Sequence, residues 1–540
     1  MTEIKGPGVY VEELPAPGSI QAAPTSHTAF IGQAERGETG QSVLITSWHA
    51  YTAEFGGFAW NAPLALSVYN FFAAGGSIAY ITRVTAAGSA AATGQTGALV
   101  FSAASPGLWG NDIRILVEPS SPEADPETAD VFRISVLYPV PDKTEMSELN
   151  SQLMARFADI NALKTLTRDD ASYLVLEDYD GVVGGQLDRS GDSKSETPLE
   201  HRINTQSYFV RLSVDEAALS DTPLKAGSLL TLAGGLGDPV DTPIDLEAAL
   251  QTLDKTDDIS LVLVPDISLI SDPDLQRDHA NRILTYCEQN TDKGLFAILD
   301  MPFGLDVEEA AAFKTGASAG PVKSGDALTS SLGALYYPWV DILLPVNMRQ
   351  VPTPPSGMMA GVYAQTDHAV GPWQAPAGTT YGHLSLATGL ERKISADDQD
   401  TLNPIGINAI REFPTYGIVA YGARTLTRDP ALVYLSVRRT LLLIETSLRG
   451  GLRYLVFEPN TPSTWAIVTR QVSDFLTDLW RQGALVGSKA SEAFIVICDA
   501  TNNPPEAQRS GKLVVDVSVS MIHPAEFTSI RLEFLVGSES

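Results

Sequence analysis

The sequence predicts a multidomain protein of mixed α/β and α+β class, with a mostly β domain inserted into an α/β core. Three observations support this prediction. Strand-like apolar runs alternate with helical patterns between residues 231 and 345, as in parallel sheets with helical crossovers. Residues 86–98 are a tract of small residues that introduces a stretch of short strand candidates. The first 27 residues hold too much proline and glycine for a packed helix and predict an extended arm.

Length and charge limit the function. The chain has 540 residues, which is too long for one hydrophobic core. Its 36 Lys and Arg against 65 Asp and Glu give a formal net charge of −29, which argues against binding to nucleic acid or to an anionic membrane surface. With 44% hydrophobic residues, wholesale disorder is excluded.

The two cysteines exclude a disulfide framework. Cys287 and Cys498 each lie in an apolar segment, so we expect two reduced, buried thiols in a protein made in the cytosol. The N-terminus shows no signal-peptide pattern, and no apolar run approaches the length of a membrane span.

The N-terminal arm, residues 1–27, contains one β-prone run, Val9-Tyr10-Val11. A frayed terminus is one interpretation. The other is a strand meant for a partner's sheet, because residues 12–27 can span on the order of 50 Å.

The remaining elements follow in order. Residues 28–85 predict a core α/β part, made of a strand, a helix over Ala62–Ala74 and a second strand. Residues 86–230 predict the inserted, solvent-exposed and mostly β domain. Residues 231–380 predict an α/β core domain, with buried central strands and a long loop over 346–380.

Residues 381–540 predict a further domain with two long helices. Asp429-Pro430 starts the first helix and Gly450-Gly451 ends it. The run LRYLVFEPN predicts a strand, and Ser463 is the expected N-cap of the second helix. Three more strands are expected within 493–500, 512–521 and 527–536.

The sequence contains no coherent motif for a catalytic, cofactor or metal site. Gly316 to Gly320, with Ser318 between them, match the spacing of a nucleophile elbow but follow a helical pattern where an elbow needs a strand. A small-residue loop is the better interpretation. The seven histidines show no metal-ligand spacing, so we expect no catalytic, cofactor or metal site.

Two acidic residues keep an enzyme alternative open. Asp266 and Asp300 follow predicted parallel strands, whose carboxyl ends gather ligands in open sheets. An α/β hydrolase-like or metal-dependent enzyme is therefore the alternative. The competing interpretation is that both residues cap the following helix or turn.

The first long C-terminal helix carries a group of charges. Arg438, Arg439, Glu445 and Arg449 are candidates for intersubunit or partner-facing ion pairs. A solvated charge stripe beside the apolar stripe is the competing interpretation.

Several segments in order resemble one known family. From the N-terminus they are GPGVYVEEL, PTSHTAFIGQAERG, FAILDMP, ALYYPWVDILLP, SGMMAGVYAQTDHAVGPWQAPAG, LNPIGINAIREFPTYGIVAYGARTL, YLSVRRTLLLIETSLRGGLRYLVFEPN, and DFLTDLWRQGAL through PAEFTSIRLEFLV. Together they are similar to contractile tail sheath proteins of phage tails, R-type bacteriocins and phage-tail-like contractile injection systems. The resemblance is nearly continuous in the C-terminal half and hardly extends to 86–230.

The resemblance implies a structural subunit. Sheath subunits stack as rings in a helical polymer around an inner tube, and contraction drives the tube through a target envelope. By position, Val9, Tyr10 and Val11 would be the donated N-terminal strand. Part of 512–538 would be the C-terminal arm and the sheet that receives it. Residues 381–540 would be the sheath domain facing the tube, and 86–230 an outer decoration that carries much of the negative charge.

The implied partners are other copies of the chain, the inner tube protein, the baseplate and tail-terminator or cap proteins, with no nucleic acid and no membrane insertion. The particle would be assembled in the bacterial cytoplasm and then released or anchored. A secreted adhesin or capsid-like module is the third function class, disfavoured by the missing signal peptide and paired cysteines.

Overall fold

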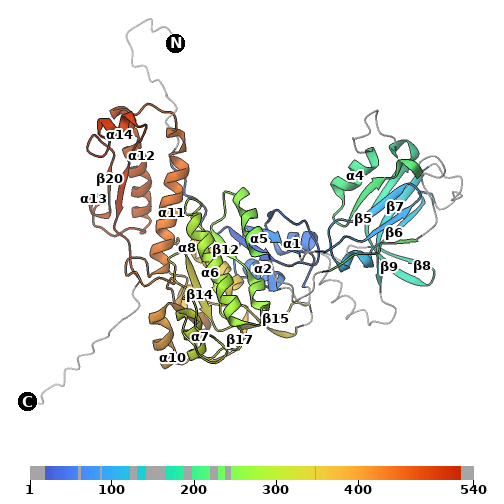
Figure 1. Ribbon diagram of the computed structural model, residues 1–540, viewed down its shortest axis with the longest axis horizontal. Coiled ribbons are helices and arrows are strands. Elements are labelled where there is room, and N and C mark those ends of the chain that lie inside the picture. Colours follow the sequence, from blue (N-terminus) through green and yellow to red (C-terminus); the bar gives the residue numbers. More distant parts are fainter. Residues whose placement is uncertain are drawn as a thin grey trace, which may run out of the picture. The chain divides into compact units, whose positions relative to one another are not determined.

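The computed structural model describes residues 19–58, 63–85, 88–121, 131–140, 164–187, 197–218, 229–237, 245–346 and 348–524 (Figure 1). The chain divides into two compact units, residues 25–438 and residues 439–540 together with 1–24.

An eight-stranded sheet forms the centre of the larger unit. Its strand order is β19-β18-β14-β13-β12-β1-β3-β2. The strands are β1 (Thr28–Gly32), β2 (Val43–Ile45), β3 (Ala79–Arg83), β12 (Leu261–Leu263), β13 (Phe296–Asp300), β14 (Gly333–Tyr337), β18 (Ile407–Phe413) and β19 (Gly417–Ala420). The six central strands pair in parallel, and the edge strands β2 and β19 pair antiparallel. The predicted parallel arrangement is confirmed, and β1 and β14 are buried at every position, as expected of strands covered on both faces.

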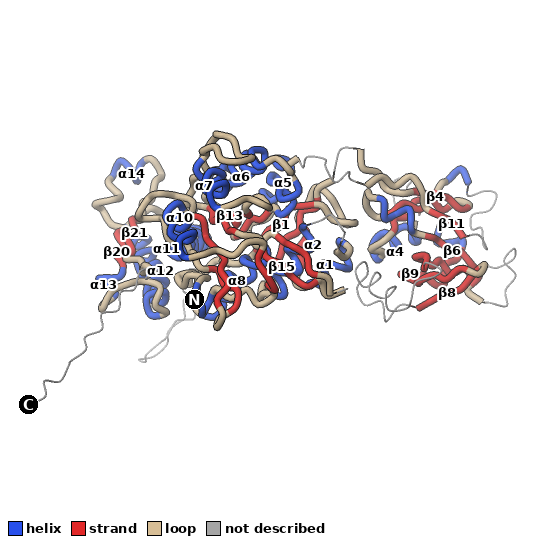
Figure 2. Tube along the Cα trace, turned by 90° about the horizontal axis from the view of Figure 1, so that it is seen from below, coloured by secondary structure: helices blue, strands red, loops and turns tan. Residues whose placement is uncertain are grey.

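Helices cover both faces of this sheet. They are α1 (Trp48–Phe55), α2 (Pro63–Ala73), α5 (Leu246–Thr252), α6 (Pro273–Gln289), α7 (Val307–Thr315), α8 (Ser356–Ala369), α9 (Gly378–Tyr381) and α10 (Ala396–Leu402). Figure 2 shows α5, α6 and α7 on one face, with α2 and α8 on the other. A small sheet of β15 (Val340–Leu343), β16 (Gln350–Thr353) and β17 (Ala387–Leu390) adjoins them.

The prediction of a long loop over 346–380 is wrong, because α8 occupies its centre. Two glycines of α8 lie against α2. A Cβ built on Gly357 would lie 2.4 Å from the carbonyl oxygen of Ser67, and one on Gly361 would lie 2.6 Å from that of Phe71. Glycine at these positions lets the backbones of α8 and α2 touch, although glycine has a low intrinsic helix propensity.

The described residues between 88 and 237 form two antiparallel sheets around a hydrophobic core. One has the order β10-β5-β4 and the other β11-β6-β7-β9-β8. The strands are β4 (Thr93–Thr96), β5 (Leu99–Ala103), β6 (Arg114–Pro119), β7 (Val131–Val140), β8 (Lys164–Arg168), β9 (Ala171–Val183), β10 (Val210–Val214) and β11 (Leu229–Thr231), and the helix is α4 (Pro198–Gln206). Phe101, Ile115 and Leu199 are fully buried in the shared core.

A short stem leads into and out of these sheets. Ala90 pairs antiparallel with Leu236, and Thr93 pairs with Ala233. At the same end, the guanidinium of Arg83 donates to the carbonyl oxygens of Ala34 (3.0 Å), Gly37 (2.8 Å) and Pro106 (2.8 Å). The β-rich part is thus tied to β3 by a buried cation as well as by the chain.

The C-terminal unit contains two long helices and a two-stranded sheet. Its elements are α12 (Pro462–Arg481), α13 (Ala490–Ala493), α14 (Pro505–Arg509), β20 (Phe494–Ile497) and β21 (Asp516–Val519), together with most of α11 (Leu435–Gly451). Thr461, not the predicted Ser463, is the N-cap of α12. The expected strand over 527–536 lies outside the described residues.

The strand predicted for LRYLVFEPN is also wrong. The segment begins with a 3-10 turn over Arg453–Leu455 and continues as an exposed connection between two helices. No neighbouring strand of the described residues pairs with it. An apolar run needs such a partner to satisfy its backbone groups as a strand.

Candidate functional site

The packing of α12 explains how the small sheet is held. Its apolar residues recur at helical spacing and face inward, with Val468, Val472 and Leu476 fully buried. The helix contacts β20 (Figure 1). At its C-terminal end, the indole N–H of Trp480 donates to the carbonyl oxygen of Gly487 (2.9 Å), which fixes the turn that leads toward the sheet.

The sheet beside α12 is incomplete. β20 and β21 pair antiparallel, with Ile495 opposite Ser518 and Ile497 opposite Asp516. Within the described part of the chain, each strand has this one strand neighbour. Directly after β21, Met521 pairs with Leu485 as an isolated bridge, so the open edges are those of β20 and of β21 itself, residues 516–519. Ile495 is 55% exposed and Ile497 39% exposed, on the alternate positions to the half-buried Phe494. Two strands are marginal alone, so this sheet is suited to receive further strands.

The N-terminal segment begins, where it is described, beside the end of α11. Ile20 is buried, and a Cβ on Gly451 would lie 2.7 Å from its side chain. The backbone N–H of Ala23 donates to the hydroxyl of Ser447 (2.8 Å). The base of the predicted arm is therefore fixed on α11. Val9, Tyr10 and Val11 lie outside the described residues.

The four predicted charges of α11 are in different environments. Arg439 is 4% exposed, Arg438 is half-buried, and Glu445 and Arg449 are exposed. The burial of Arg439 does not suit a charge offered to a partner. The assignment of these residues to an interface stays a prediction.

Asp266 follows β12 and holds the N-terminus of a helix far away in the sequence. Its carboxylate accepts backbone hydrogen bonds from Gln33 (2.5 Å) and from Leu64 in the first turn of α2 (3.1 Å). Gly32 leaves room for this carboxylate, because a Cβ there would lie 2.7 Å from an oxygen. Burial raises the pKa of Asp266 to about 7, against the lowering effect of the two bonds.

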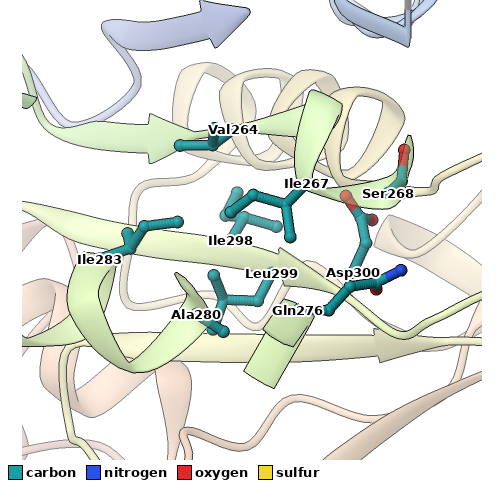
Figure 3. Close-up of a pocket in the computed structure, with 9 residues that line it drawn as sticks. All are labelled: Val264, Ile267, Ser268, Gln276, Ala280, Ile283, Ile298, Leu299 and Asp300. Carbon is teal, nitrogen blue, oxygen red and sulfur yellow. The ribbon is translucent and has the colours of Figure 1, made fainter. Parts of the chain in front are cut away.

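Asp300 has the same role at the end of β13. It accepts hydrogen bonds from the backbone N–H (2.8 Å) and the hydroxyl (2.5 Å) of Ser356, the first residue of α8. Burial raises its pKa to about 7. Asp300 also lines a cavity of about 20 Å³, the room of one water molecule, with Ser268 and Gln276 at the same end (Figure 3).

These contacts favour the capping interpretation of Asp266 and Asp300 over the catalytic one. Ser318 does not form a nucleophile elbow, because Gly316 ends α7 and the Ser318 hydroxyl donates to the carbonyl oxygen of Val322 (3.1 Å). Cys287 and Cys498 are free and buried, as predicted.

The described residues show neither a metal site nor a membrane-spanning helix. Among them, no group of three or more His, Cys, Asp or Glu side chains is arranged to hold a metal ion. None of the helices there has the length and apolar character needed to cross a bilayer.

Comparisons with known proteins agree with the family resemblance. A family model described as the phage tail sheath C-terminal domain matches residues 427–534. The tail sheath protein of Vibrio phage KVP40 is 30% identical over 193 residues, which are 36% of this chain. The matched part spans only 28% of that relative's length.

Two solved structures are similar over nearly the whole chain. One is the contracted sheath complex of an extracellular contractile injection system, PVC, with a TM-score of 0.57 and 18% identity over 99% of both chains. The other is the contracted helical sheath of the anti-feeding prophage, with a TM-score of 0.55 and 20% identity over 98% of this chain and 99% of that one. At this identity, the likeness shows a shared fold.

Proposed function

Because the chain belongs to the contractile tail sheath protein family, we propose that it is the structural subunit of a contractile sheath. Copies polymerise helically around an inner tube, and contraction of the polymer drives the tube through a target envelope. The observation that carries this proposal is the likeness to contracted sheath subunits along 98–99% of the chain, together with the sheath C-terminal domain match over 427–534.

The proposed assembly step is strand exchange. Val9–Val11 of one copy, and part of 512–538, add strands to the β20–β21 sheet of neighbouring copies. The free edges of this sheet and its exposed Ile495 and Ile497 support the proposal, because added strands would satisfy the edges and cover the side chains. The fixed base of the arm at Ile20 supports it as well, since donation needs a defined starting point.

The remaining domain assignments belong to the same proposal. Residues 28–85 and 231–380 form the core, 381–540 form the sheath domain that faces the tube, and 86–230 form an outer decoration. The separate core and narrow stem of the β-rich part support its role as an insertion. Most of the acidic run SPEADPETAD lies outside the described residues.

The proposed partners are other copies of the chain, the inner tube, the baseplate and a terminator or cap protein, with no nucleic acid and no membrane insertion. Assembly takes place in the bacterial cytoplasm, and the particle is then released or anchored. Solved structures of the similar anti-feeding prophage include a helical sheath and a baseplate, which supports other copies of the chain and a baseplate among these partners.

Electron microscopy tests the function. The full chain is expressed alone and together with the products of neighbouring genes, and striated tubes are expected. A matched variant lacking residues 1–18 keeps Ile20 at its place on α11, so its subunits are expected to fold but not to form tubes. Unassembled wild-type chains in both settings would contradict the sheath function. Normal tubes from the truncated chain would contradict strand donation by the arm.

A further inference from the structure

The connection between α11 and α12 presents two apolar side chains to solvent. We name residues 452–459 the tip loop. Val456 is 63% exposed and Phe457 is completely exposed. Phe457 also has a φ of +77°, in the left-handed region that non-glycine residues avoid. An exposed aromatic ring on a strained backbone is stable only if the surroundings hold it there.

Hydrogen bonds hold both sides of the tip loop on α12. On one side, the hydroxyl of Tyr454 donates to the side-chain carbonyl of Gln471 (2.5 Å). On the other, the hydroxyl of Thr464 donates to the carbonyl oxygen of Pro459 (2.6 Å). The backbone N–H of Glu458 donates to the carbonyl oxygen of Leu455 (3.0 Å), which closes a turn around the two apolar residues. The tip is thus a preorganised feature, and binding would lose little conformational entropy in ordering it.

We propose that Val456 and Phe457 dock on a second copy of this chain in the polymer. This inference rests on the proposed sheath function and deepens it, by naming a contact made by side chains in addition to the exchanged strands. Burial against a neighbour would remove the ring from water, which is the gain that an exposed, rigidly held phenylalanine offers an interface.

Charge favours a second copy as the partner. Around the tip, the exposed Arg449 and Arg453 outnumber the one exposed acidic residue, Glu458, whereas the whole chain carries a net charge of −29. Another copy therefore presents a mainly acidic surface, which favours the approach of a segment with a small excess of positive charge.

The tip loop is also continuous with both parts of the proposed strand exchange. At its N-terminal end, Gly451 receives Ile20 at the base of the arm. At its C-terminal end, the side-chain amide of Asn460 donates to the carbonyl oxygen of Lys512 (2.9 Å), just before β21. A neighbour that exchanges strands with this unit therefore approaches the tip loop from either end.

Photocrosslinking identifies the partner. The photoreactive residue p-benzoylphenylalanine replaces Phe457 in the full chain, which is expressed with the neighbouring gene products, and assembled particles are irradiated. We expect a product of twice the subunit mass, whose linked peptides both come from this chain. Links only to the tube or another protein, or no links in intact sheaths, would overturn the proposal.

A pair of variants measures the contribution of the contact. Phe457→Gly removes the ring and relieves the strain, because glycine adopts positive φ freely, so the subunit is expected to keep its stability. The concentration needed for assembly is expected to rise about ten- to a hundredfold, from the loss of one buried aromatic side chain.

Tyr208→Ser is the matched control, because Tyr208 is an aromatic residue that is 56% exposed within the β-rich part. We expect it to assemble like the wild type. Unchanged assembly of Phe457→Gly would refute the tip contact while leaving the sheath function intact. A wild-type chain that forms no sheath would overturn the sheath function first, and this inference with it.

Discussion

The contact between α8 and α2 gives a prediction in which two effects of opposite sign compete. Replacing Gly361 by alanine improves helix propensity by about 1 kcal/mol. The new Cβ, however, would lie 2.6 Å from both the Cβ of Ala74 and the carbonyl oxygen of Phe71. Ordinary contacts begin near 3.4 Å, so the helices must separate by about 0.8 Å. Because overpacking of this kind costs about 1–3 kcal/mol, we expect a net loss of about 1 kcal/mol.

Hydrogen exchange of the full chain, followed by mass spectrometry, measures this loss locally. Amides of α2 and α8 should exchange about fivefold faster in Gly361→Ala, because 1.4 kcal/mol corresponds to a factor of ten. Gly450→Ala in α11 is the control. A Cβ there meets nothing within 4 Å, so α11 should exchange more slowly, by a factor of about two to five.

A second substitution tests the steric cause. Ala74→Gly removes one of the two atoms that the new Cβ approaches, so it should recover part of the protection lost in Gly361→Ala. Equal or slower exchange of α2 and α8 in Gly361→Ala would refute the reasoning, because the steric term would then not outweigh helix propensity.

Three further predictions concern other contacts. Burial raises the pKa of Asp300 to about 7, so the folded chain holds the proton of this carboxyl more tightly than the unfolded chain does. The resulting contribution to the free energy of unfolding is full below about pH 4 and is lost as the pH rises to 7. Asp300→Asn should therefore gain stability over wild type across that range, by about 1–3 kcal/mol in urea titrations; a pH-independent difference would contradict this. Arg83→Met leaves three carbonyl oxygens without their donor and should lower the melting temperature of the larger unit; an unchanged melting temperature would contradict the anchoring role. Ile495→Asp should leave the subunit folded, with unchanged circular dichroism, but prevent tube formation in micrographs; normal tubes would contradict the receiving role of β20.

Continuous apolar runs made the central strands predictable. Strands such as β1 and β13 contain almost no polar residue, and such runs have few alternatives to a buried parallel sheet. The α8 helix was missed because its glycines serve a close approach to α2, and no local pattern reveals which helix lies opposite. The run at 452–460 was misassigned because apolar composition does not show whether a partner strand exists.

The two buried carboxylates also have partners that the sequence alone could not reveal. Asp266 and Asp300 were correctly placed at the ends of parallel strands, and capping was one of the two interpretations. The backbone groups whose hydrogen bonds they accept, however, lie 202 residues before Asp266, at Leu64, and 56 residues after Asp300, at Ser356. Only the folded chain brings such partners together. The sequence therefore indicated that these carboxylates could cap a helix, but not which helix each of them caps.

The stem at the base of the β-rich part has a practical consequence. Ala90 and Leu236 exchange backbone hydrogen bonds (3.0 and 3.3 Å), so the chain leaves and re-enters the core at neighbouring points. Paired residues of this kind lie about 5 Å apart, a gap that a two-residue turn closes. The intervening 145 residues therefore leave and re-enter the core at one place, and a foreign domain with adjacent termini grafted onto the stem would also have to replace the carbonyl oxygen of Pro106 that Arg83 contacts.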